Sequence, residues 1–135
     1  MIEKKLIVVE SRLAAHGEYS NKDHLRYLLW CCRYVADEGH DPIASHLVCP
    51  WFLDDSVAAE RAQGYCSGWF WLGQPHWFFM DLGESRGMKA AKLRCLNNGF
   101  QFKILNLPVE YSAAFRANLY PPHTRGFAVA PEVKP

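Results

Sequence analysis

The residues best suited to chemistry lie between Met80 and Cys95, in the stretch MDLGESRGMKAAKLRC. An apolar run leads into a turn that contains Gly83, Ser85 and Gly87, and then into a segment with helical spacing. The first amide N–H groups of a helix have no partner within the helix, and the helix dipole is positive at this end. Such a turn therefore binds a phosphate or carboxylate readily. The guanidinium groups of Arg86 in the turn and Arg12 after an earlier apolar run are suited to bidentate hydrogen bonds with the same anion.

Two other interpretations fit the same turn. In one it is an ordinary strand-to-helix connection, in which Ser85 caps the helix, Gly83 makes the turn and the Arg86 side chain lies in solvent. In the other, Gly-Glu-Ser-Arg-Gly is the G-x-S-x-G motif of a serine hydrolase, which requires an acid and a histidine later in the chain. Only His123 follows, with Glu110 as the one acid before it, so we do not expect serine-hydrolase chemistry.

Four apolar runs and three segments with helical spacing alternate along the chain. The runs expected to form strands are Lys5–Glu10, residues 43–48 (IASHLV), 76–82 (HWFFMDL) and 100–107 (FQFKILNL). The expected helices cover residues 24–40, a segment that starts at 54–56 and stops at 73–75, and residues 85–99. Strands and helices in this order predict a parallel sheet with helices on both faces.

Local signals mark where these elements begin and end. Ser20 or Asn21 is a plausible N-cap of the first helix, and Gly39 is suited to its C-terminus. Asp41-Pro42 is expected to break the chain before the second strand, and Asn98-Gly99 to end the last helix.

Polar residues follow the expected strands. Ligands of an open parallel sheet bind beyond the carboxyl ends of its strands. The residues expected to bind a ligand there are Ser11, Arg12, Ser45, His46, Asp54, Asp55, Asp81, Gly83, Ser85, Arg86 and Gly87. For His46 the alternative is a core histidine bonded to a backbone carbonyl. Glu60 and Arg61, in the acidic segment that begins at Asp54, are compatible with a solvated helix face.

Three blocks together resemble a known family. The blocks are IVVES, ASHLV followed by LDD…ER…G, and DLGESRGM, and they cover roughly residues 5 to 107. They resemble a small uncharacterised family, common in phage genomes, which in turn is similar to the nucleoside 2-deoxyribosyltransferase superfamily. The resemblance implies a flavodoxin/Rossmann-like three-layer α/β sandwich with four to five parallel strands, and a nucleoside or nucleotide bound at the strand ends. It places Glu10, Glu60 and Arg61 in the pocket with the residues named above other than Arg12.

Enzymes of that superfamily attack the sugar's anomeric carbon with a glutamate in the helix after this turn, since a carboxylate can form a glycosyl ester and leave again. Here the corresponding stretch, MKAAKLRC, contains no carboxylate. Glu10, Asp81 and Glu84 are the remaining candidates, and whether N-glycosidic chemistry occurs stays open.

Composition excludes several other classes of function. The formal net charge is +1 over 135 residues, which does not favour a nucleic-acid or acidic-membrane surface. No apolar run is long enough to span a bilayer, and the N-terminus has no signal-peptide core, so we expect a cytoplasmic protein. The five cysteines lack the spacing of a zinc site or disulfide framework, the histidines form no metal motif, and no metal or cofactor is expected.

We therefore expect residues 1–108 to form a nucleoside 2-deoxyribosyltransferase-like domain that binds a nucleotide-like or phosphoribosyl small molecule. Residues 109–135 are expected to form a C-terminal extension, with a short helix at 112–120 and a proline-rich tail. The aromatic-rich segment from Tyr65 to Phe79 supports an alternative, an accessory protein that acts on a host protein and retains a vestigial pocket. The same segment is also compatible with a homodimer or higher homo-oligomer.

Overall fold

The computed structural model describes residues 3–13, 16–47, 52–54, 56–60 and 73–122. In chain order, the helices and strands within this part are β1 (Leu6–Glu10), α1 (Asn21–Asp37), β2 (Asp41–Ile43), the 3-10 helix η1 (Ser45–Leu47), β3 (His76–Phe79), α3 (Arg86–Asn98), β4 (Phe102–Leu105) and α4 (Val109–Arg116).

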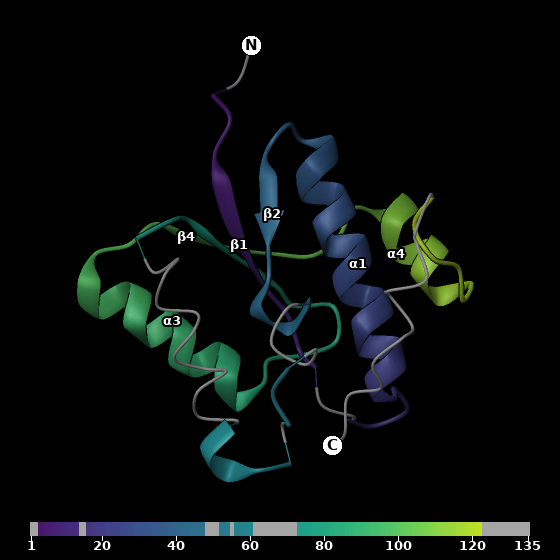
Figure 1. Ribbon diagram of the computed structural model, residues 1–135. Helices are drawn as coiled ribbons and strands as arrows, with labels where there is room; N and C mark the ends of the chain where they lie inside the picture. Colours follow the sequence, from purple (N-terminus) through teal and green to yellow (C-terminus); the bar gives the residue numbers. More distant parts are fainter. Residues whose placement is uncertain (1–2, 14–15, 48–51, 55, 61–72, 123–135) are drawn as a thin grey trace.

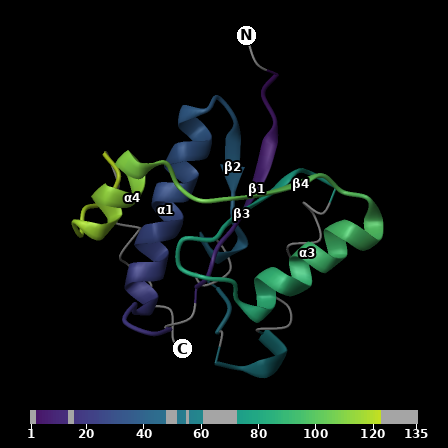
Figure 2. The same ribbon diagram turned by 180° about the vertical axis from the view of Figure 1, so that it is seen from behind.

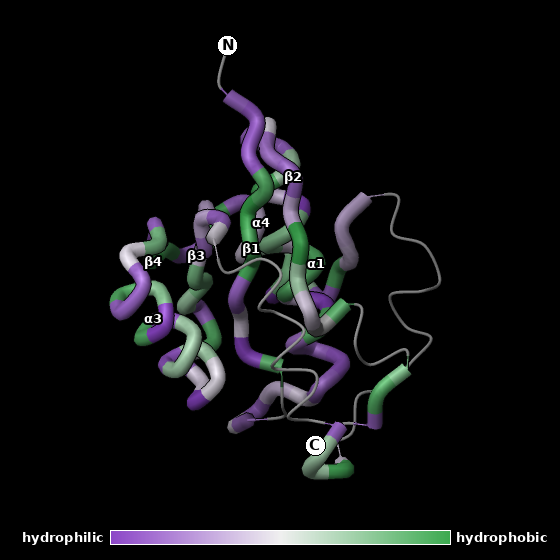
Figure 3. The backbone as a smooth tube through the Cα atoms, turned by 60° about the vertical axis from the view of Figure 1, so that its left-hand side comes forward, coloured by the Kyte–Doolittle hydropathy of each residue, from purple (hydrophilic) through white to green (hydrophobic). Residues whose placement is uncertain are grey.

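The four strands form one parallel sheet in the order β2-β1-β3-β4. The central strand β1 reads LIVVE, and its three middle residues are buried, as expected for a strand covered on both faces. Figure 3 shows this hydrophobic part of β1 between more hydrophilic ends. The expected α/β class with a parallel sheet is confirmed.

Helices lie on both faces of the sheet. Successive strand residues point to opposite faces, so that Phe79 packs in a cluster with α1, whereas Phe78 packs in a second cluster with Met88 and Cys95 of α3. Figures 1 and 2 accordingly show α1 and α4 on one side of the strands and α3 on the other. The result is a three-layer sandwich.

The expected ends of two helices are confirmed. Ser20 caps α1: its side chain accepts a hydrogen bond from the Asp23 amide, and the Asp23 carboxylate accepts one from the Ser20 amide. Ser85 caps α3, and Gly99 ends it in the left-handed conformation with φ 69°.

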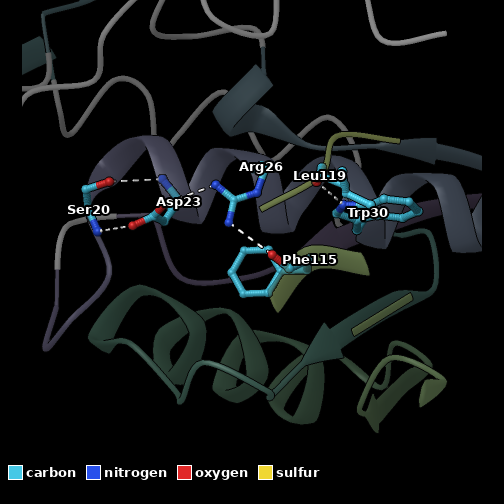
Figure 4. Close-up of polar contacts among 6 residues, drawn as sticks. All are labelled: Ser20, Asp23, Arg26, Trp30, Phe115 and Leu119. Atoms are coloured by element: carbon cyan, nitrogen blue, oxygen red, sulfur yellow. Dashed lines mark hydrogen bonds and ion pairs between the residues drawn. The ribbon is translucent and has the colours of Figure 1, made fainter. Parts of the chain in front are cut away.

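Helix α4 packs against α1 as part of the same core. Phe115 of α4 is buried in the cluster that contains β1 and α1. Arg26 donates from Nη2 to the Phe115 carbonyl over 3.1 Å, and the Trp30 indole donates to the Leu119 carbonyl over 2.8 Å (Figure 4). The Tyr111 hydroxyl of α4 also donates to the Asp37 carboxylate over 2.6 Å, so the chain after β4 is held along the length of α1.

Several expected boundaries were wrong. The second strand is not residues 43–48 but Asp41–Ile43, and Asp41-Pro42 pairs with β1 instead of breaking the chain. Pro42 is tolerated because β2 is an edge strand. The third and fourth strands end earlier than their apolar runs, and the last helix spans Val109–Arg116 instead of residues 112–120.

Candidate functional site

The sheet order defines where a ligand crevice belongs. From β1 the chain continues to β2 on one side, whereas β3 and β4 follow on the other. This order matches the flavodoxin-like type of doubly wound sheet, in which ligands bind where the order reverses, at the carboxyl ends of β1 and β3. The residues that follow these two strands are therefore the first to consider.

The turn after β3 is built around Gly83. Its amide donates to the Met80 carbonyl over 3.0 Å, and its φ of +93° lies in the region that favours glycine. The Ser85 side chain then accepts a hydrogen bond from the Met88 amide over 3.1 Å and starts α3. The amides of Arg86 and Gly87 donate to no atom of the described residues.

Arg12 connects the two strand ends. Its Nη1 donates to the Glu84 carbonyl over 3.2 Å, across 72 positions of sequence. A Cβ added at Gly83 would lie 3.3 Å from the same nitrogen, so the guanidinium rests against the turn. Arg12 therefore lies against the turn that precedes α3, whereas the Arg86 side chain is exposed.

The same turn also has the features expected of an ordinary strand-to-helix connection. Ser85 caps the helix, Gly83 makes the turn and Arg86 is exposed, as that interpretation requires. Capping and anion binding are compatible, because the cap uses the Ser85 hydroxyl and an anion uses the free amides beside it.

Two of the three candidate catalytic carboxylates are already bound within the protein. Asp81 Oδ2 accepts hydrogen bonds from the Tyr27 hydroxyl over 2.5 Å and from the Leu107 amide over 2.9 Å. Burial raises the pKa of Tyr27 far above its usual value, so this hydroxyl stays a neutral donor. Glu84 Oε2 pairs with Lys92 Nζ at 2.6 Å. Through its hydrogen bonds with Tyr27 and Leu107, Asp81 connects the end of β3 to α1 and to the backbone just after β4.

Glu10, the third carboxylate, ends β1 and accepts no hydrogen bond from the described residues. Its Oε1 lies 3.7 Å from Nδ1 of His76. Burial raises the pKa of the Cys95 thiol on α3, and the nearby Glu10 charge adds to this effect. Glu10 therefore points to the face of the sheet that α3 covers.

Two buried polar side chains at these strands have no hydrogen-bond partner among the described residues. They are Ser11, which is 1% exposed, and His76, which is 2% exposed. Ser11 was expected at the site. His76 was not expected there. In the sequence it stands out only as a histidine at the start of an otherwise apolar strand.

The other expected site residues that the structure describes follow β2 in the chain. Ser45 and His46 lie in η1, after β2. Asp54 Oδ1 accepts hydrogen bonds from the amide and hydroxyl of Ser56, and residues 58–60 are helical. Figures 1 and 2 place residues 56–60 at the end of the sheet where α3 begins. Glu60 accepts a hydrogen bond from the Asp54 amide.

Some expectations fall outside the described residues. These are Asp55 and Arg61, residues 61–72 of the expected second helix with most of the aromatic segment, and residues 123–135 of the expected proline-rich tail. Within the described part, Phe78 and Phe79 are buried and no group of three metal-binding side chains occurs. None of the helices in that part is long and apolar enough to cross a membrane.

The fold and the carboxyl edge together define a doubly wound α/β domain with flavodoxin-like strand order and polar groups at its switch point. The chain belongs to the family described as "Domain of unknown function (DUF7768)", whose model matches residues 5–105, from just before β1 to the end of β4. Comparison with curated proteins and with solved structures gave no match.

Proposed function

We propose that this domain binds the phosphate of a nucleotide-like or phosphoribosyl small molecule between the carboxyl ends of β1 and β3. The observation that carries the proposal is the contact of Arg12 with the turn that starts α3. The contact joins a guanidinium to the residue just before the Ser85 cap, and the free amides of Arg86 and Gly87 follow that cap; both kinds of group favour a bound anion.

The remaining residues of the edge fit such a ligand. The Arg12 hydrogen bond to Glu84 uses Nη1, which leaves the other guanidinium N–H groups for an anion. Ser11 adds a buried hydroxyl without a partner among the described residues. Asp81, expected among the ligand-binding residues, acts in this proposal by holding the turn, because Tyr27 and Leu107 already donate to its Oδ2.

N-glycosidic chemistry on the bound ligand is the reaction that this proposal allows. Asp81 and Glu84 are engaged by protein groups, so Glu10 is the carboxylate that we assign to it. A reaction would appear as free base released from a nucleoside 5′-monophosphate, and Glu10→Gln would abolish it.

Binding is tested by isothermal titration calorimetry and thermal shift with inorganic phosphate, ribose 5-phosphate and the common nucleoside 5′-monophosphates. We expect at least one organic phosphate to raise the Tm of the wild-type protein. Arg12→Gln should weaken its binding about tenfold, which corresponds to about 1.4 kcal/mol.

Arg33→Gln is the matched control, because Arg33 is an exposed arginine of α1 paired with Asp37. Its affinity should equal that of the wild type. If no phosphate compound stabilises the wild-type protein, or if both arginine variants lose affinity equally, the proposal is wrong.

A further inference from the structure

A buried histidine lies beside the carboxylate at the end of β1. His76 opens β3 on the face that α3 covers, and its ring stacks on Phe78 with centroids 6.1 Å apart. Neither ring nitrogen has a hydrogen-bond partner among the residues that the structure describes. Nδ1 lies 3.7 Å from Glu10 Oε1, which is longer than a hydrogen bond.

This arrangement is costly for stability alone. A buried imidazole without partners loses its hydrogen bonds to water and gains none in the folded protein. A phenylalanine at the same place would keep the stacking on Phe78 without that loss. A hydrogen bond between His76 and Glu10 would offset this cost.

Glu10 is the outer member of the pair. Its side chain is 20% exposed whereas that of His76 is 3% exposed, and Glu10 directly precedes Ser11 and Arg12 at the carboxyl edge. Of the two side chains, Glu10 is therefore the more accessible one at this edge, and His76 is the more deeply buried.

We propose that Glu10 binds a hydrogen-bond-donating group of the ligand, and that His76 is the positioning residue that holds the Glu10 carboxylate for it. This inference rests on the proposed function. A carboxylate accepts hydrogen bonds from hydroxyl or amino groups and repels phosphate, so the anionic end lies at Arg12 and the neutral end at Glu10. The neutral donors are the hydroxyls of the sugar or the amino edge of the base.

The His76 imidazole is suited to this positioning. With its proton on Nδ1, a small closure of the 3.7 Å gap lets the ring donate to one carboxylate oxygen, and the other oxygen remains for the ligand. Binding the ligand then satisfies Glu10 and His76 together.

The test compares Glu10→Gln, His76→Phe and His76→Asn with the wild type by isothermal titration calorimetry. The probes are inorganic phosphate, ribose 5-phosphate, the nucleoside 5′-monophosphates with their 2′-deoxy forms, and the nucleosides. Asparagine keeps an N–H donor near the place of Nδ1 but loses ring volume, whereas phenylalanine keeps the volume and loses the donor. The two His76 variants therefore separate positioning from packing.

We expect Glu10→Gln and His76→Phe to bind the nucleotides about tenfold more weakly, His76→Asn to stay within about threefold of the wild type, and phosphate binding to be unchanged in all three. A loss that persists with ribose 5-phosphate assigns Glu10 to the sugar, and a loss confined to the nucleotides assigns it to the base. Glu38→Gln, at an exposed acid that follows α1, is the control and should bind as the wild type.

The inference is overturned if His76→Phe binds nucleotides as the wild type does, or if His76→Asn is the weaker of the two variants. The proposed function fails separately if nucleosides bind and the phosphate adds no affinity. No binding of any probe overturns both.

Discussion

Replacing Arg26 by methionine tests how strongly α4 is held to the domain that precedes it. The Arg26 side chain is buried where α1 meets α4, and its guanidinium makes three close contacts besides a longer one with the Tyr120 ring. It pairs with Asp23 at 3.0 Å, donates to the Phe115 carbonyl over 3.1 Å, and lies 4.7 Å from the centre of the Phe115 ring (Figure 4). Methionine preserves most of the side-chain length and removes all three contacts.

The expected cost follows from these contacts. A hydrogen bond from a charged donor to a buried carbonyl contributes about 1.5–3 kcal/mol. The Asp23 carboxylate is partly exposed, so that ion pair adds about 0.5 kcal/mol, and the ring contact adds about 1 kcal/mol. Dehydration of the guanidinium opposes these gains. We expect Arg26→Met to lower the free energy of unfolding by about 2–3 kcal/mol.

Arg33→Met is the matched control. Arg33 lies on the same helix and pairs with Asp37 at the same 3.0 Å, but both side chains are more than one-third exposed. Its loss should cost only about 0.3–0.5 kcal/mol. Urea unfolding followed by circular dichroism measures both values, and hydrogen exchange of the amides at 109–120 should accelerate only in Arg26→Met.

Two results would refute the reasoning. One is a cost for Arg26→Met within about 0.5 kcal/mol of that for Arg33→Met, since burial would then add nothing. The other is a destabilised protein whose amides at residues 109–120 exchange as slowly as in the wild type.

Three further predictions concern the turn after β3 and the start of α1. Gly83→Ala should cost about 1–2 kcal/mol in urea unfolding, because its φ is +93° and the new Cβ meets Arg12, whereas Gly73→Ala, in open space, should be nearly neutral. Ser85→Ala should cost about 1 kcal/mol by the same measurement, because it removes the α3 cap; an unchanged urea midpoint would contradict this. The hydrogen bond from the Ser20 amide lowers the pKa of Asp23 below its usual value, so this carboxylate stabilises the fold above about pH 4 and the effect is lost as the pH falls through the lowered pKa. Urea midpoints at pH 7 and pH 3 should therefore differ less in Asp23→Asn than in the wild type.

Local sequence determined the order of the elements and the caps of two helices. The run LIVVE is apolar at every position but the last, which suits a strand between two helical layers. Ser20 and Ser85 cap helices, and Gly99 ends one, because these effects depend on a few neighbouring residues. The parallel α/β class followed from the order of the elements.

Only the tertiary structure decided which of these elements pair and which side chains meet. The second strand could not be located from its apolar residues, because pairing with β1 selects Asp41–Ile43 and an edge position tolerates Pro42. The sequence predicted Asp81 and Arg12 as ligand-binding residues. In the structure each hydrogen-bonds to the protein itself, and the partners Tyr27 and Glu84 lie 54 and 72 positions away, a separation that no local pattern encodes. The same holds for His76, whose burial beside Glu10 exists only because β1 and β3 are neighbours in the sheet. Capping and strand formation arise from short-range sterics and hydrogen bonds. The candidate site, in contrast, is formed by the ends of β1 and β3, which are far apart in the sequence and become neighbours in the sheet.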